Sequence, residues 1–96
     1  MTSKQRANLR SMAAGIEPIY QVGKDGLGDN LVAGLNEALE KRELVKITVL
    51  RSSDFSAKEV LDELCAALLA EPVCAIGNKV VLYRRSSVEG VKHIEF

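Results

Sequence analysis

A single histidine and two cysteines are all that this chain offers for metal binding or nucleophilic catalysis. Cys65 and Cys74 lack the CxxC spacing of zinc sites, and no set of histidines completes one. Both lie on apolar patterns, so we expect buried free thiols rather than a disulfide. His93, close to the C-terminal end, is the only histidine that could act as a base. We therefore expect no metal, no cofactor and no catalytic residue, although an active site built on lysines or carboxylates stays open.

Long apolar runs are also missing. No segment approaches the roughly 18 consecutive apolar residues that a membrane-spanning helix needs. Residues 1–8 are polar and lack the apolar core of a signal peptide. The sequence therefore predicts a cytoplasmic protein with no membrane partner.

Net charge is absent as well, because 13 basic residues balance 13 acidic ones. A neutral chain is not typical of a nucleic-acid binder, which usually carries excess positive charge. The charges are unevenly distributed, however. Residues 1–24 and 77–92 are mainly basic, whereas residues 25–76 hold twice as many acidic as basic side chains. If the fold brings the two ends together, one face can steer a polyanion, although the same charges can simply solvate a surface.

The 96 residues, of which 47% are hydrophobic, suit one domain with a modest core. Segments 2–5 and 56–59 match the capping box that begins helices. Apolar residues alternate along 44–51, which is typical of a strand with one buried face. Gly77 and Asn78 are a residue pair typical of a two-residue hairpin turn. Leu69 falls on the apolar stripe of the third expected helix, so we expect it to point inward. The expected elements are helices at about 3–14, 29–42 and 57–70, and strands at 19–22, 44–51, 73–76 and 79–84.

This order, α-β-α-β-α-β-β, predicts an α/β two-layer sandwich in which helices pack on a four-stranded mixed sheet. We expect residues 1–85 to form the single domain and residues 86–96 to form a C-terminal tail.

Gly23-Lys24-Asp25-Gly26 lies between an expected strand and an expected helix. Glycines allow positive φ and close approach of another chain, and the amides at a helix start can bind an anion. Lys24 could reach a phosphate, whereas Asp25 opposes one. A plain strand-to-helix turn would also need glycine. Because residues 23–28 read GKDGLG, they match neither common nucleotide-binding pattern, so we expect no small-molecule substrate.

Two groups of basic residues flank this motif in the sequence. Tyr83 could stack on a base while Arg84 and Arg85 contact phosphates, or the arginines could only blunt an exposed strand end. Arg6 and Arg10 are four apart, so they share one face of the first helix and point outward together.

The motifs, in this order, resemble the CRM (chloroplast RNA splicing and ribosome maturation) domain family, which includes the bacterial YhbY-like proteins. The match spans about residues 2–85. Family members often have Ser or Thr where this chain has Gly28, so we expect Asp29 to cap the second helix instead. The segments that carry the resemblance are Thr2 to Arg10, Pro18, Val22 to Leu27, Glu43 to Ile47 and Gly77 to Arg84.

The resemblance implies a fold similar to the C-terminal domain of bacterial translation initiation factor 3. It also implies a non-catalytic RNA-binding protein that associates with ribosomal RNA in large-subunit precursors. Relatives in plant organelles are parts of intron-splicing factors, whereas a single domain favours the ribosomal role. The expected RNA-binding residues are Gly23, Lys24, Asp25 and Gly26 of the GxxG loop, with Lys4, Arg6, Arg10, Arg84 and Arg85 around it.

Because aromatic residues make up only 4% of the chain, we expect positioning on folded RNA rather than base-by-base recognition. A second hypothesis is an adaptor whose acidic helices bind a basic partner such as a ribosomal protein. Such an adaptor would depend on Glu37, Glu40, Asp62 and Glu63.

Overall fold

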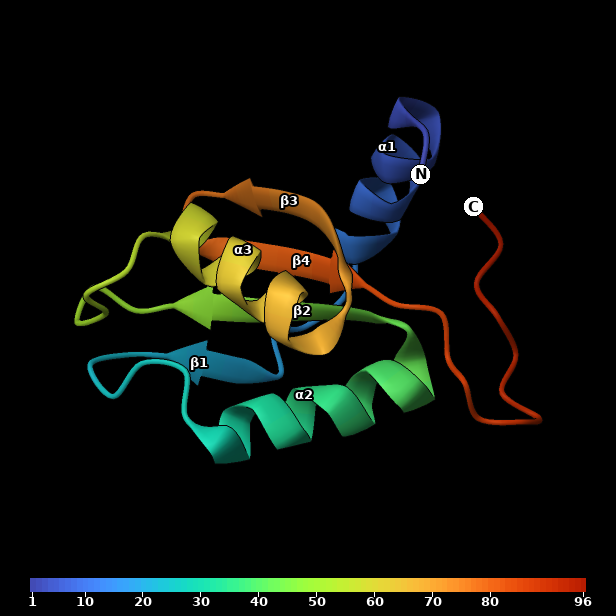
Figure 1. The fold of residues 1–96 in the computed structure, drawn as a ribbon. Coiled ribbons are helices and arrows are strands. Elements are labelled where there is room, and N and C mark those ends of the chain that lie inside the picture. The colour runs from blue at the N-terminus through green and yellow to red at the C-terminus, as the bar shows by residue number, and fades with distance from the viewer.

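The computed structural model describes all 96 residues as three helices and one four-stranded sheet (Figure 1). The expected element order and fold class are confirmed. No helix combines the length and the apolar character needed to cross a membrane. The elements are α1 (Ser3–Ala13), β1 (Tyr20–Val22), α2 (Asp29–Arg42), β2 (Leu44–Val49), α3 (Ala57–Leu68), β3 (Glu71–Ile76) and β4 (Lys79–Tyr83).

The sheet has the strand order β1-β2-β4-β3 and is mixed. β1 runs parallel to β2, with Gln21 opposite Thr48, and β4 runs antiparallel to both of its neighbours. In Figure 1 the loops that follow β1 and β2, and the β3–β4 turn, all lie at one end of the sheet. This arrangement places the Gly23–Gly26 segment on that end, at the β1 edge.

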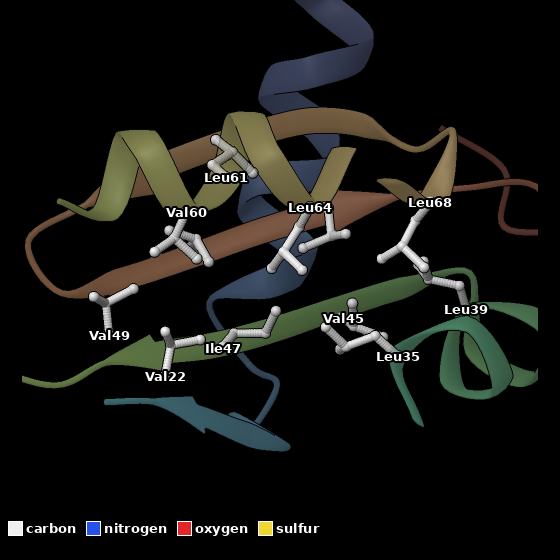
Figure 2. Close-up of a cluster of buried hydrophobic side chains, with 12 residues drawn as sticks. Val22, Leu35, Leu39, Val45, Ile47, Val49, Val60, Leu61, Leu64 and Leu68 are labelled. Carbon is white, nitrogen blue, oxygen red and sulfur yellow. The ribbon is translucent and has the colours of Figure 1, made fainter. Parts of the chain in front are cut away.

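The main core lies between one face of the sheet and the pair α2 and α3 (Figure 2). The alternation along β2 directs Val45 and Ile47 into this core, where each is at most 1% exposed. Leu35 of α2 and Leu64 of α3 are fully buried against them. Burial of each such side chain stabilises the fold by about 1.5–3 kcal/mol.

α1 packs on the opposite face of the sheet, where it contacts β2 and β3 and leaves β1 uncovered (Figure 1). Leu9 and Ala13 of α1 are buried there against Leu44, Val81 and other sheet residues. The helical layer expected from the sequence therefore consists of α2 and α3, and the other face of the sheet stays partly open.

The starts of α1 and α3 agree with the sequence predictions, but the end of α3 does not. Both capping boxes are present, with Thr2 bonded to Gln5 and Ser56 bonded to Glu59. The expected inward position of Leu69 is wrong, because this residue is 86% exposed. It ends α3 in the left-handed conformation, with φ +53°, and so leaves the helical stripe.

Residues 86–96 form no helix or strand but are bound to the domain. The Glu43 carboxylate, 1% exposed, accepts hydrogen bonds from the Ser86 and Ile94 amides, both at 2.7 Å. His93 Nδ1 lies 2.6 Å from the same carboxylate. The Phe96 ring packs edge-on against Tyr83, with 4.9 Å between ring centroids. The tail is therefore part of the folded domain, and a buried acidic residue fastens it.

Candidate nucleic-acid interface

The segment Gly23–Gly26 forms a tight turn directly after β1. The Gly26 amide donates a hydrogen bond to the Gly23 carbonyl at 3.1 Å, which closes the turn. Lys24 and Asp25 lie exposed at its tip. The turn therefore presents a lysine and a short stretch of backbone to solvent.

Each glycine of the turn meets a different geometric need. Gly26 has φ +70°, a conformation that costs other residues free energy because their Cβ approaches the backbone. A Cβ at Gly23 would lie 3.1 Å from Ser52 Oγ and 3.3 Å from Leu50 Cδ1. Gly23 thus lets the turn pack closely against the loop between β2 and α3.

The turn leads into the N-terminus of α2, where no side chain caps the helix. The expectation that Asp29 caps α2 is wrong, because Gly28 is the N-cap and Asp29 is the first helical residue. A glycine has no side-chain oxygen to accept a bond from the first helical amides. These amides therefore stay open to an external acceptor such as a phosphate oxygen.

The charge around the turn does not favour an anion by itself. Lys24 is balanced by Asp25, and Asp29 adds a second carboxylate in the first turn of α2. The turn can offer amides and one ammonium group, but cations for several phosphates must come from elsewhere.

The basic residues of α1 lie on the other side of the sheet from α2 and α3. Lys4 is exposed, and Arg6 Nε donates a hydrogen bond to the Pro72 carbonyl of β3 at 3.2 Å. Arg10 lines a groove that also contains Lys46 and Lys79. Arg6 and Arg10 thus share a helix face and are both exposed, as expected, and this face borders β3.

The two arginines after β4 have different environments. The Arg84 guanidinium donates to the Leu68 carbonyl at 2.9 Å and the Asn36 carbonyl at 3.1 Å, and it pairs with Glu40 at 3.3 Å. It therefore ties α2 and α3 together, and its side chain is only 17% exposed. Arg85 is exposed. Of the two, only Arg85 has a guanidinium free to meet a phosphate.

The structure adds Lys46 and Lys79 to the sequence-derived candidates. Lys46 lies between apolar neighbours in β2, so the sequence shows its polar position, whereas Lys79 is the first residue of β4 and is followed only by apolar residues and a tyrosine. Only the register, with Thr48 opposite Lys79, reveals that both side chains share the α1 face of the sheet.

Burial keeps the two cysteine thiols largely protonated at neutral pH. Burial raises the pKa of Cys65 to about 11, with further contributions from Asp62 and Glu71. Burial also raises the pKa of Cys74, although the positive charges of Arg10 and Lys46 oppose the rise. Both thiols are free and only partly accessible. No group of three or more His, Cys, Asp or Glu side chains is arranged to hold a metal ion.

Comparison with known proteins identifies relatives along nearly the whole chain. The profile of the CRS1/YhbY (CRM) domain matches residues 1–84. The Bacillus subtilis protein named "Probable RNA-binding protein YqeI" is 42% identical over 86 residues, which cover 90% of each chain. A Pseudomonas aeruginosa protein, also named a probable RNA-binding protein, is 29% identical over 90% of this chain and 83% of its own.

A solved structure has the same fold. The solution structure of hypothetical protein SAV1595 from Staphylococcus aureus superposes with a TM-score of 0.78 at 39% sequence identity. The superposition covers 93% of both chains.

Proposed function

We propose, because this chain belongs to the CRS1/YhbY (CRM) domain family, that it is a non-catalytic RNA-binding protein of ribosome assembly. Its target would be ribosomal RNA in precursors of the large subunit, and its place of action the cytoplasm. The names of its relatives support RNA as the partner. The assembly role rests on the family resemblance.

The geometry of the Gly23–Gly26 turn carries this proposal. The turn exposes Lys24 beside the uncapped start of α2, whose amides have no side-chain acceptor. A phosphate placed there would accept hydrogen bonds from the backbone and from the Lys24 ammonium group. Gly28, the N-cap, has no side chain and open space around it, so an RNA backbone can approach these amides closely.

Phosphate contacts from outside the turn would supply most of the binding energy. Arg10 and Arg85 have exposed side chains, and Lys4 is exposed near the start of α1. Such contacts position a protein on its nucleic acid but do not read the sequence. We therefore expect recognition of RNA shape, with affinity that falls steeply as salt is added.

Co-sedimentation with large-subunit precursor particles tests the proposal. We compare wild type with Lys24→Gln at low and raised salt. The control is Lys41→Gln, an exposed lysine near the C-terminal end of α2, away from the turn (Figure 1). We expect salt-sensitive binding by wild type and Lys41→Gln, and weaker binding by Lys24→Gln.

Equal binding by all three proteins would remove the turn from the contact surface. Loss of binding on neutralising the acidic helices would favour the adaptor hypothesis. Of the acidic residues on which that hypothesis depends, Glu40 already accepts hydrogen bonds from Ser86 and Ser87 and forms an ion pair with Arg84. Glu37, Asp62 and Glu63 are exposed.

A further inference from the structure

A groove of about 230 Å³ lies on the open part of the sheet, between the C-terminal half of α1 and strands β2, β4 and β3. Three cations and an apolar floor define it. The residues of this groove, called the α1-face groove below, include Arg10, Lys46 and Lys79 above Cys74, Ile76 and Val81.

The charge of the α1-face groove has one sign. No carboxylate lines it, in a protein whose acidic and basic residues are equal in number. It therefore holds an uncompensated group of three cations, unlike the Gly23–Gly26 turn, where two carboxylates accompany Lys24. The site best suited to several phosphates is this groove.

The two lysines of the groove are held in place but are not saturated. Lys46 Nζ donates to the Ile16 carbonyl at 3.3 Å, and Lys79 Nζ donates to Thr48 Oγ1 at 3.0 Å. An ammonium group has three donors, so each lysine retains two for a ligand. Positioning by the protein lowers the entropy lost when a phosphate is bound.

The register connects the groove to the turn. Gln21, Thr48 and Lys79 stand opposite one another on β1, β2 and β4. Neighbouring strands are about 4.8 Å apart, so Lys79 lies roughly 10 Å across the sheet from Gln21, two residues before the turn. A single extended strand could cross this short distance without bending around the domain.

We propose that the α1-face groove is a second RNA contact, occupied by a single-stranded segment that continues from the Gly23–Gly26 turn across β1 and β2. Arg10, Lys46 and Lys79 bind its phosphates. The apolar floor, where Ile76 is 61% exposed, packs against a sugar or base. This inference rests on the proposed RNA-binding function and adds the location and the single-stranded character of the RNA.

The size of the groove favours a strand over a small molecule. Pockets for small ligands usually enclose about 300–1,000 Å³, so this smaller site fits one unit of a longer chain. An acidic peptide would match the charge, but an RNA segment follows from the adjoining turn and the exposed floor.

Cys74 and Cys65 allow a footprinting test on the wild-type protein, with no substitution. Cys74 lies in the groove, whereas Cys65 belongs to α3 on the opposite side of the sheet. Both are partly buried free thiols. We measure alkylation of each thiol with and without a single-stranded RNA 20-mer. The proposal predicts that the RNA slows alkylation of Cys74 several-fold and leaves Cys65 unchanged. Equal protection by a polyglutamate of matched charge, or no protection despite RNA binding, would overturn it.

Affinity measurements separate this inference from the proposed function. Lys46→Gln and Lys79→Gln should each weaken binding of the 20-mer about tenfold and lower the salt slope by about 1, relative to Lys41→Gln. If wild type binds no RNA at any salt, the proposed function fails. If Lys24→Gln weakens binding while the groove variants, shown by circular dichroism to be folded, bind like wild type, only the groove inference fails.

Discussion

Glu43 offers the sharpest test of how the tail is held. This residue ends α2 with φ +67°, a conformation in which glycine or asparagine is usual. Its buried carboxylate accepts bonds from Ser86, His93 and Ile94. Burial alone would raise the pKa of Glu43, but these hydrogen bonds outweigh it and hold the pKa below its ordinary value. The carboxylate thus stabilises the docked tail in its ionised form.

The variant Glu43→Gln keeps the size of the side chain and changes only its bonding. Glutamine has one carbonyl oxygen, and its amide group would face a donor. In either orientation at least one backbone amide, Ser86 or Ile94, loses its acceptor. An unsatisfied buried amide costs about 1–3 kcal/mol. We therefore expect a loss of about 2 kcal/mol, which lowers the Tm of a domain this size by roughly 8–16 °C.

Thermal unfolding followed by circular dichroism at pH 7 measures this loss. The matched control is Glu37→Gln, an exposed position on the same helix. Hydrogen exchange should also accelerate at Ser86 and Ile94 in Glu43→Gln and stay unchanged in the control. If both variants melt within about 2 °C of each other, the argument that the carboxylate fastens the tail is refuted.

Three further predictions concern acid stability, Arg84 and Leu69. Hydrogen bonds from Ser87 lower the pKa of Glu40 to about 2, so its contribution is complete above pH 4.5 and disappears as the pH falls toward 2. Acid titration of the unfolding free energy should show this decline, and Glu40→Gln should reduce it. Arg84→Gln should lower the unfolding free energy measured in urea by about 2 kcal/mol, because two helix carbonyls lose a charged donor. Arg85→Gln should leave that free energy unchanged and lower the salt slope of RNA binding by about 1. Leu69→Gly should raise stability by ~1 kcal/mol, since the exposed leucine holds a left-handed conformation; an unchanged Tm would contradict that explanation.

Local sequence signals predicted most elements because their causes are local. The capping boxes at Thr2 and Ser56 locate two helix starts, since a capping side chain bonds to amides within the next turn. The Gly77-Asn78 pair locates the β3–β4 turn, where Gly77 has φ +59°. The end of α3 was misjudged because Leu69 is apolar and fits the helical period, although its backbone leaves the helix.

The candidate site was only partly accessible from the sequence. The Gly23–Gly26 turn could be recognised because its two glycines are only three residues apart in the chain. The sequence could not show that Arg84 bonds within the fold while Arg85 is exposed, since the partners of Arg84 on α2 and α3 are distant in sequence. The expected RNA-binding roles of the turn and of the basic residues stay predictions.

The sequence by itself determined the order of elements, the two-residue periodicity that directs Val45, Ile47 and Val49 into the main core, and the uneven distribution of charge. These depend on interactions within a few residues of the chain. Tertiary structure alone decided which charges meet. It placed Arg10, Lys46 and Lys79 on one open face and turned Glu43 into the anchor of the tail. Strand register and helix placement bring these groups together, and both are set by burial of apolar surface across the whole domain.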